Sequence, residues 1–85
     1  MTLGALDGNA AAGLLFQAYG REMTAAIGSC NGCGNTGPLA EAVAFLRAPG
    51  TVLRCRRCSA VLVVLVDRGE AVVPYEAGVR LTERS

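Results

Sequence analysis

Apolar residues recur with helical spacing near the start of the chain. Four of them stand at positions i, i+3, i+4 and i+7 and form one narrow apolar stripe, namely Ala11, Leu14, Leu15 and Ala18. Asp7 is a candidate N-cap, and Gly20 suits the left-handed residue that ends a helix. The pattern predicts a helix over about residues 7–19. Because Gly13 inside it costs roughly 1 kcal/mol relative to alanine, we expect this helix to need a surface to pack on.

The rest of the chain consists of short segments with the character of β-strands. They are Met23–Ser29, Leu39–Arg47, Thr51–Arg54, Ala60–Val66, Ala71–Tyr75 and Val79–Thr82. A turn is expected at Ala48-Pro49-Gly50, and a hairpin at Asp67-Arg68-Gly69-Glu70, where Gly69 is free to take a positive φ. Pro74 cannot donate a hydrogen bond to a neighbouring strand, which predicts an edge strand.

The longest apolar run, Ala60–Val66, reads AVLVVLV. Apolar residues on both faces predict a central strand covered on both sides. The alternative is that part of the run is left open in the monomer and pairs in a homodimer. Seven residues are far fewer than the roughly 20 that a membrane-spanning helix needs, so no membrane association is expected.

Composition narrows the class of protein. At 85 residues the chain has room for one domain, and a chain this short buries only about 60% of its unfolded surface, so a supplementary cross-link is expected. The chain has four Cys and no His. The absence of His excludes Ser-His-Asp and Cys-His catalysis and every His-ligated metal site. No enzymatic function is therefore expected. Residues 1–10 contain no Lys or Arg, which argues against a secretory signal and for a cytoplasmic protein.

Two C-x2-C pairs carry the chemistry of the sequence. Cys30 and Cys33 form the first pair and Cys55 and Cys58 the second, separated by residues 34–54. Two intervening residues let each pair aim both sulfurs at one ion, which predicts a single structural Zn²⁺ with four thiolate ligands and no open position for catalysis. Ser59 stands where the first pair has a glycine and tolerates a positive φ less well, so a looser second turn is expected.

Other chemistries use the same residues. A rubredoxin-like iron site takes the same four ligands. A thiol–disulfide active site is disfavoured because the chain has two pairs and no βαβ pattern, and structural disulfides are disfavoured in a reducing cytosol.

Each C-x2-C pair with its turn is called a knuckle. The two knuckles and the short strands over Gly28 to Val66 resemble the zinc-ribbon superfamily. A further set of short motifs looks like a bacterial family of unknown function: Leu6-Asp7-Gly8-Asn9-Ala10, Met23-Thr24-Ala25-Ala26, Cys33-Gly34, Gly37-Pro38-Leu39-Ala40-Glu41, Ala48-Pro49-Gly50 and Arg54-Cys55. That resemblance implies an N-terminal helix attached to a zinc ribbon, and no activity. The expected fold is a small β-rich zinc ribbon of antiparallel strands, with one N-terminal helix packed on the sheet. Its parts would be the helix at about 7–19, the ribbon at about 22–67 and a C-terminal hairpin or tail at about 68–85.

Four arginines near the second knuckle offer a further candidate surface: Arg47, Arg54, Arg56 and Arg57. They would either contact nucleic acid or offset the charge of a four-thiolate zinc site. Four thiolates and one Zn²⁺ together lower the formal net charge of the chain by two, from +1 to −1. The second role is favoured because the chain lacks a strongly basic footprint. The four aromatic residues are expected in the core. The leading hypothesis is a non-enzymatic interaction module that docks on a protein partner, and the alternatives are a nucleic-acid-associated zinc ribbon and an iron redox protein.

Overall fold

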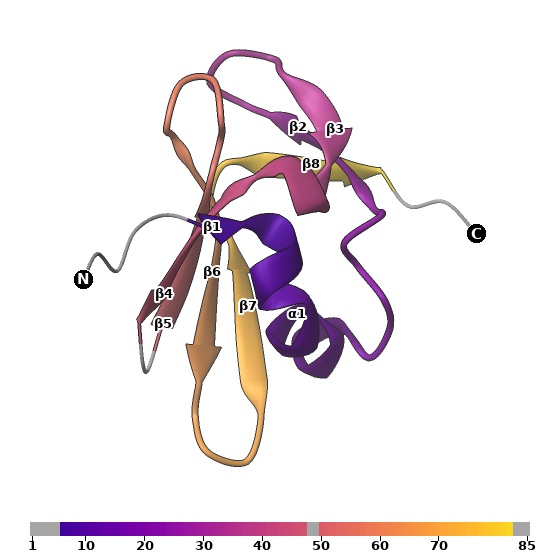
Figure 1. Cartoon of the computed structure of the whole chain (residues 1–85), viewed down its shortest axis with the longest axis vertical. Helices are drawn as coiled ribbons and strands as arrows, with labels where there is room; N and C mark the ends of the chain where they lie inside the picture. The colour runs from indigo at the N-terminus through magenta and orange to yellow at the C-terminus, as the bar shows by residue number, and fades with distance from the viewer. Residues whose placement is uncertain (1–5, 48–49, 83–85) are drawn as a thin grey trace.

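The computed structural model describes residues 6–47 and 50–82, and these form short strands and one helical segment (Figure 1). Along the chain the elements are β1 (Leu6–Asp7), η1 (Gly8–Ala11), α1 (Ala12–Tyr19), β2 (Ile27–Cys30), β3 (Thr36–Pro38), η2 (Leu39–Glu41), β4 (Val43–Arg47), β5 (Gly50–Arg54), β6 (Val61–Asp67), β7 (Val72–Glu76) and β8 (Val79–Thr82), where η marks a 3-10 turn. The prediction of antiparallel strands with one N-terminal helix is confirmed.

The strands pair in two antiparallel sheets. The larger sheet has the order β1-β4-β5-β6-β7, and the smaller one has the order β3-β2-β8. Because β8 pairs with β2, residues 79–82 belong to the smaller sheet, whereas β7 forms an edge of the larger one. Pro74 therefore lies on an edge strand, as its missing N–H requires.

The predicted helix is confirmed as a 3-10 turn followed by α1. The Asp7 carboxylate accepts a hydrogen bond of 3.1 Å from the Asn9 amide at its start. Gly20 ends it with a φ of 75°, and the Gly20 amide donates to the Phe16 carbonyl. Leu15 is fully buried in the core, and α1 packs along β7 beside β6 (Figure 1). No helix among residues 6–47 and 50–82 has the length and apolar character needed to cross a membrane.

Two of the expected strands begin later than the sequence predicts. Residues Met23–Ala26 form a turn, closed by a bond from the Ala26 amide to the Met23 carbonyl, so β2 begins only at Ile27. Glu22 holds this turn by accepting from both the amide and the hydroxyl of Thr24. The segment after Pro38 first makes η2, and β4 starts at Val43. The turn expected at Ala48-Pro49-Gly50 lies largely outside the described residues.

Strand β6 lies in the interior of its sheet, between β5 and β7, but it is covered on only one face. Leu62, Val63 and Leu65 are buried, whereas Val64 and Val66 remain partly exposed. The register shifts where β5 meets β6, between Leu53 and Arg54, so two consecutive residues of β6, Leu62 and Val63, face inward. The expectation of cover on both faces is therefore wrong. The hairpin expected after β6 is confirmed, with Gly69 at a φ of 90°.

Candidate metal centre

Each cysteine pair occupies the turn of a β-hairpin, and the two hairpins come from different sheets. Cys30 ends β2, and the chain turns back through residues 31–35 into β3 of the smaller sheet. Cys55 follows β5, and the chain turns back into β6 of the larger sheet. In Figure 1 the two turns lie side by side at one end of the molecule. The cysteines are therefore placed where the two sheets meet.

The first turn is fixed by backbone hydrogen bonds around Cys30. The Gly34 amide donates to the Cys30 carbonyl at 2.8 Å, and the Cys30 amide donates to the Asn35 carbonyl at 2.8 Å. The Gly32 amide donates to Cys30 Sγ at 3.3 Å. Gly34 has a φ of 81°, in the left-handed region that glycine enters without steric cost.

The second turn repeats this geometry bond for bond. The Ser59 amide donates to the Cys55 carbonyl at 2.9 Å, and the Cys55 amide donates to the Ala60 carbonyl at 2.8 Å. The Arg57 amide donates to Cys55 Sγ at 3.4 Å. Ser59 has a φ of 68°, so it takes the same left-handed conformation as its glycine counterpart. The expected looser turn is wrong, because the paired bonds hold the serine in place despite its Cβ.

The four cysteine sulfurs converge on one point between the turns. All four Sγ atoms lie within 4.8 Å of one another. Two separations of 3.6 Å each join Cys30 to Cys58 and Cys33 to Cys55, with one sulfur from each knuckle. A disulfide requires about 2.05 Å, whereas two ligands of a tetrahedral Zn–S₄ site with bonds of about 2.3 Å lie about 3.8 Å apart. The spacing matches metal ligands, and the four residues form a cluster that could bind a metal ion.

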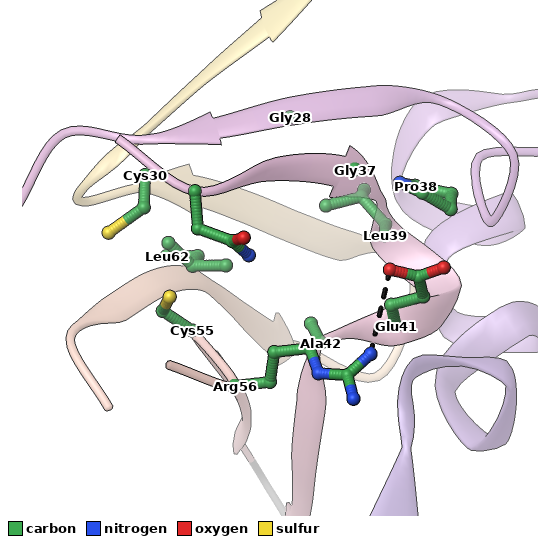
Figure 2. A pocket seen from close by; sticks show the side chains of 11 residues that line it. Gly28, Cys30, Gly37, Pro38, Leu39, Glu41, Ala42, Cys55, Arg56 and Leu62 are labelled. Atoms are coloured by element: carbon green, nitrogen blue, oxygen red, sulfur yellow. Dashed lines mark ion pairs between the residues drawn. The ribbon is translucent and has the colours of Figure 1, made fainter. Parts of the chain in front are cut away.

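The cluster has a buried and an exposed half. Cys30 and Cys55, the first residue of each pair, are buried, whereas Cys33 and Cys58 are exposed. A small pocket runs inward from the buried half, between the two sheets. Figure 2 shows the Cys30 and Cys55 side chains at one end of it, with the buried Leu62 between them. An ion here would touch solvent on one side and rest on the apolar core on the other.

The surroundings of the cluster lower the pKa of Cys30 and Cys55 and raise the pKa of Cys58. The Cys58 and Arg57 amides lower the pKa of Cys55 to about 6, against the opposing effect of burial. The Cys33 and Gly32 amides likewise lower the pKa of Cys30. At Cys58 the Ala60 amide lowers the pKa, but the Cys30 sulfur, burial and the other sulfurs outweigh it and raise the pKa to about 11. The hydrogen bonds of the two turns therefore favour the thiolate form of Cys30 and Cys55, and a thiolate is the form that binds a metal.

The structure does not gather the four arginines into one patch. Arg54 donates at 2.8 Å to the Ser59 carbonyl, and its guanidinium lies 5.8 Å from the centre of the Phe45 ring. Arg56 forms an ion pair with Glu41 on η2, at 3.6 Å and with both side chains more than half exposed (Figure 2). The guanidinium of Arg57 is exposed and makes no ion pair or hydrogen bond among the described residues.

Arg47 lies at the far end of the same hairpin. Its strand partner is Gly50, whereas Arg54 pairs with Val43 at the opposite end of β4. The two positions on β4, Val43 and Arg47, are four residue steps apart, a distance of about 13 Å. The predicted grouping of Arg47 with the second knuckle is therefore wrong, and sequence proximity misled because the chain reverses between β4 and β5.

The Leu6–Ala10 motif has a packing explanation in the fold. A Cβ at Gly8 would fall on the Leu39 carbonyl oxygen and would come within 2.8 Å of the Leu39 carbonyl carbon. Glycine is thus required where η1 crosses η2, and Asp7 caps the same turn. The cap is predictable from the sequence, whereas the crossing of η1 and η2 leaves no local signal in the chain.

The comparisons with known proteins add a family and no activity. No curated protein and no solved structure matches the chain. A family described as one of unknown function, DUF6510, matches residues 2–83. That match spans nearly the entire sequence, both cysteine pairs included, and the chain therefore belongs to the DUF6510 family.

Proposed function

We propose that this chain is a non-enzymatic module that one structural Zn²⁺ holds together and that acts by docking on a protein partner. The observation that carries the proposal is the convergence of four sulfurs, two from the hairpin of each sheet. An ion bound there would join the larger sheet to the smaller one at the end where their turns meet. The ligands would be Cys30, Cys33, Cys55 and Cys58.

The donor set favours zinc and a structural role. Four thiolates are soft ligands, and zinc is their usual partner in closed tetrahedral sites. Since all four positions are taken by sulfur, no place remains for a water molecule or a substrate on the metal. Binding of this kind contributes on the order of 10 kcal/mol to folding, enough to decide whether a small two-sheet domain folds.

Exposed apolar side chains support a docking role. Phe16, on the outer side of α1, is 54% exposed, which is unusual for a phenylalanine that serves only the core. Aromatic side chains, phenylalanine included, are enriched at the centres of protein interfaces. The expectation that all four aromatic residues lie in the core is wrong, because Phe16 and Tyr75 are exposed.

The metal half of the proposal is tested on the purified full chain. Native mass spectrometry with elemental analysis is expected to find one zinc per chain and a colourless protein. Removal of the ion by a chelator is expected to abolish the folded circular dichroism signal, and added Zn²⁺ to restore it. A chain that stays folded in excess chelator contradicts the proposal, and a red protein containing iron selects the redox alternative.

The docking half is tested by cross-linking in the native cell, with Phe16→Ala as the variant and Gln17→Ala as the matched control, since residue 17 is also exposed on α1. We expect one protein to be cross-linked to the native chain and to the control and to be lost with Phe16→Ala. Equal recovery with all three chains rejects the helix as the docking surface.

Nucleic-acid binding has less support. Two of the arginines named for it are engaged within the chain, Arg54 with Ser59 and Arg56 with Glu41. Binding that falls steeply with salt would favour this alternative.

A further inference from the structure

The larger sheet has a second face that the helix does not cover. Residues directly opposite one another on neighbouring strands share a face, and one such row crosses four strands in register: Phe45 on β4, Val52 on β5, Val64 on β6 and Tyr75 on β7. The adjoining row continues the same face with Arg47, Gly50, Val66 and Val73. The central part of this face is apolar from one side of the hairpins to the other.

Exposure separates this face from the core face. The opposite row, Ala44, Leu53 and Val63, is fully buried. On the open face Val52 and Val64 remain partly exposed and Tyr75 is 48% exposed. Among the described residues, none of the four in the row belongs to the core cluster or packs against it. An apolar sheet face of this kind is a candidate contact surface.

Charged residues lie at the borders of this surface. Arg47 shares the row of Gly50, Asp7 shares the row of Val43 and Val61, and between Val43 and Val61 stands Arg54. The Arg54 guanidinium is already held by the Ser59 carbonyl and the Phe45 ring. A partner that covers the row from Phe45 to Tyr75 meets no acid or base within that row, and it needs no opposite charge there.

We propose that a second copy of this chain covers this face, with the two sheets stacked as in a β-sandwich. The row reads aromatic, valine, valine, aromatic from either side. A two-fold axis parallel to the strands, between β5 and β6, therefore sets Phe45 against the partner's Tyr75 and Val52 against the partner's Val64. A symmetric dimer requires such self-complementarity, which a face shaped for a different chain does not need.

The size of the face sets the strength of the dimer. Four strands about 4.8 Å apart and five residues long, at about 3.3 Å each, give roughly 320 Å² per copy. The two copies together bury roughly 650 Å², well below the about 1,600 Å² of a standard stable interface. The dimer is therefore weak and reversible, and it forms at high protein concentration. This inference does not depend on which ion the cysteines hold.

The test is sedimentation equilibrium on the metal-loaded full chain, from about 10 µM to about 1 mM, a range suited to a small interface. The weight-average mass is expected to rise from 8.7 kDa toward twice that value. Val64→Glu, which places a charge at the centre of the face, is expected to weaken association at least about tenfold. Leu46→Glu is the matched control, because Leu46 is an exposed leucine on the opposite face of the same sheet. It is expected to leave association unchanged.

Circular dichroism and metal content establish that each variant is folded. If Val64→Glu does not fold, Tyr75→Glu makes the same test at a side chain that is already half exposed. A native chain that stays monomeric at the highest concentration overturns the proposal and leaves the face to a different chain. Equal weakening by Val64→Glu and Leu46→Glu also overturns it. Failure to bind zinc with the fold intact would reject the proposed metal centre and leave this inference standing.

Discussion

Two alanine substitutions of the same kind, placed five residues apart, should change stability in opposite directions. Gly8 lies in η1, where an added Cβ would meet the Leu39 carbonyl group and come within 3.0 Å of the Ala40 Cα. Gly13 lies in α1, where an added Cβ meets nothing within 4 Å. Neither glycine has a positive φ, so the difference between the two substitutions comes from space and helix propensity alone.

The magnitude at Gly8 follows from how firmly η2 is held. The Leu39 amide donates to the Ala26 carbonyl and the Ala40 amide to the Thr24 carbonyl, at 3.0 and 2.9 Å, so η2 cannot move away without breaking both bonds. Overpacking of a protein core costs about 1–3 kcal/mol in the free energy of unfolding. Because the obstacle at Gly8 is the backbone of Leu39, we expect Gly8→Ala to cost about 3 kcal/mol or more. Gly13→Ala should stabilise by about 0.5–1 kcal/mol.

Urea unfolding of the metal-loaded chains, at one buffered concentration of free Zn²⁺, measures both effects. We expect the two variants to differ by about 3–4 kcal/mol in the free energy of unfolding. Equal stability of the two variants, or a Gly8→Ala chain as stable as the native one, would refute the crossing of η1 over η2.

Three further predictions test single contacts. Ser59→Gly should stabilise the second knuckle by about 1 kcal/mol, because glycine takes the positive φ without the steric cost of a Cβ; a loss of stability in urea would contradict the left-handed turn. Burial raises the pKa of Tyr19, and so do the hydrogen bond to Glu76 and the charge of Glu76. The stability that this contact contributes is therefore complete below the unfolded tyrosine pKa of about 10, and it is lost as the pH rises further. Urea midpoints from about pH 8 to about pH 11 should therefore fall more for the native chain than for Tyr19→Phe, and parallel curves would contradict this. Glu41→Gln should change stability by less than about 0.5 kcal/mol, because the ion pair with Arg56 is exposed, and a larger loss would show a stronger contact.

The candidate site could be predicted because its geometry is local. The turn at Cys30 and Cys33 is closed by backbone hydrogen bonds between residues no more than five positions apart in the sequence, and the same is true of the turn at Cys55 and Cys58. The helix was predictable for a similar reason, since its stripe and its Gly20 terminus lie within one stretch of chain.

Features that depend on tertiary contacts were not predictable from the pattern. The run AVLVVLV is apolar on both faces, and nothing within it shows that α1 covers only one of them. The Met23–Ala26 segment has strand character, but the Glu22 carboxylate binds Thr24 and stabilises a turn. Arg47 and Arg54 are near in sequence yet lie at opposite ends of their hairpin, because β4 and β5 run in opposite directions.

The central claim is that four sulfurs bind one zinc ion between the two sheets. X-ray absorption at the zinc edge of the purified protein measures this most directly. We predict four sulfur neighbours at about 2.3 Å and no oxygen or nitrogen neighbour. A shell containing oxygen or nitrogen, or fewer than four sulfurs, would contradict the account.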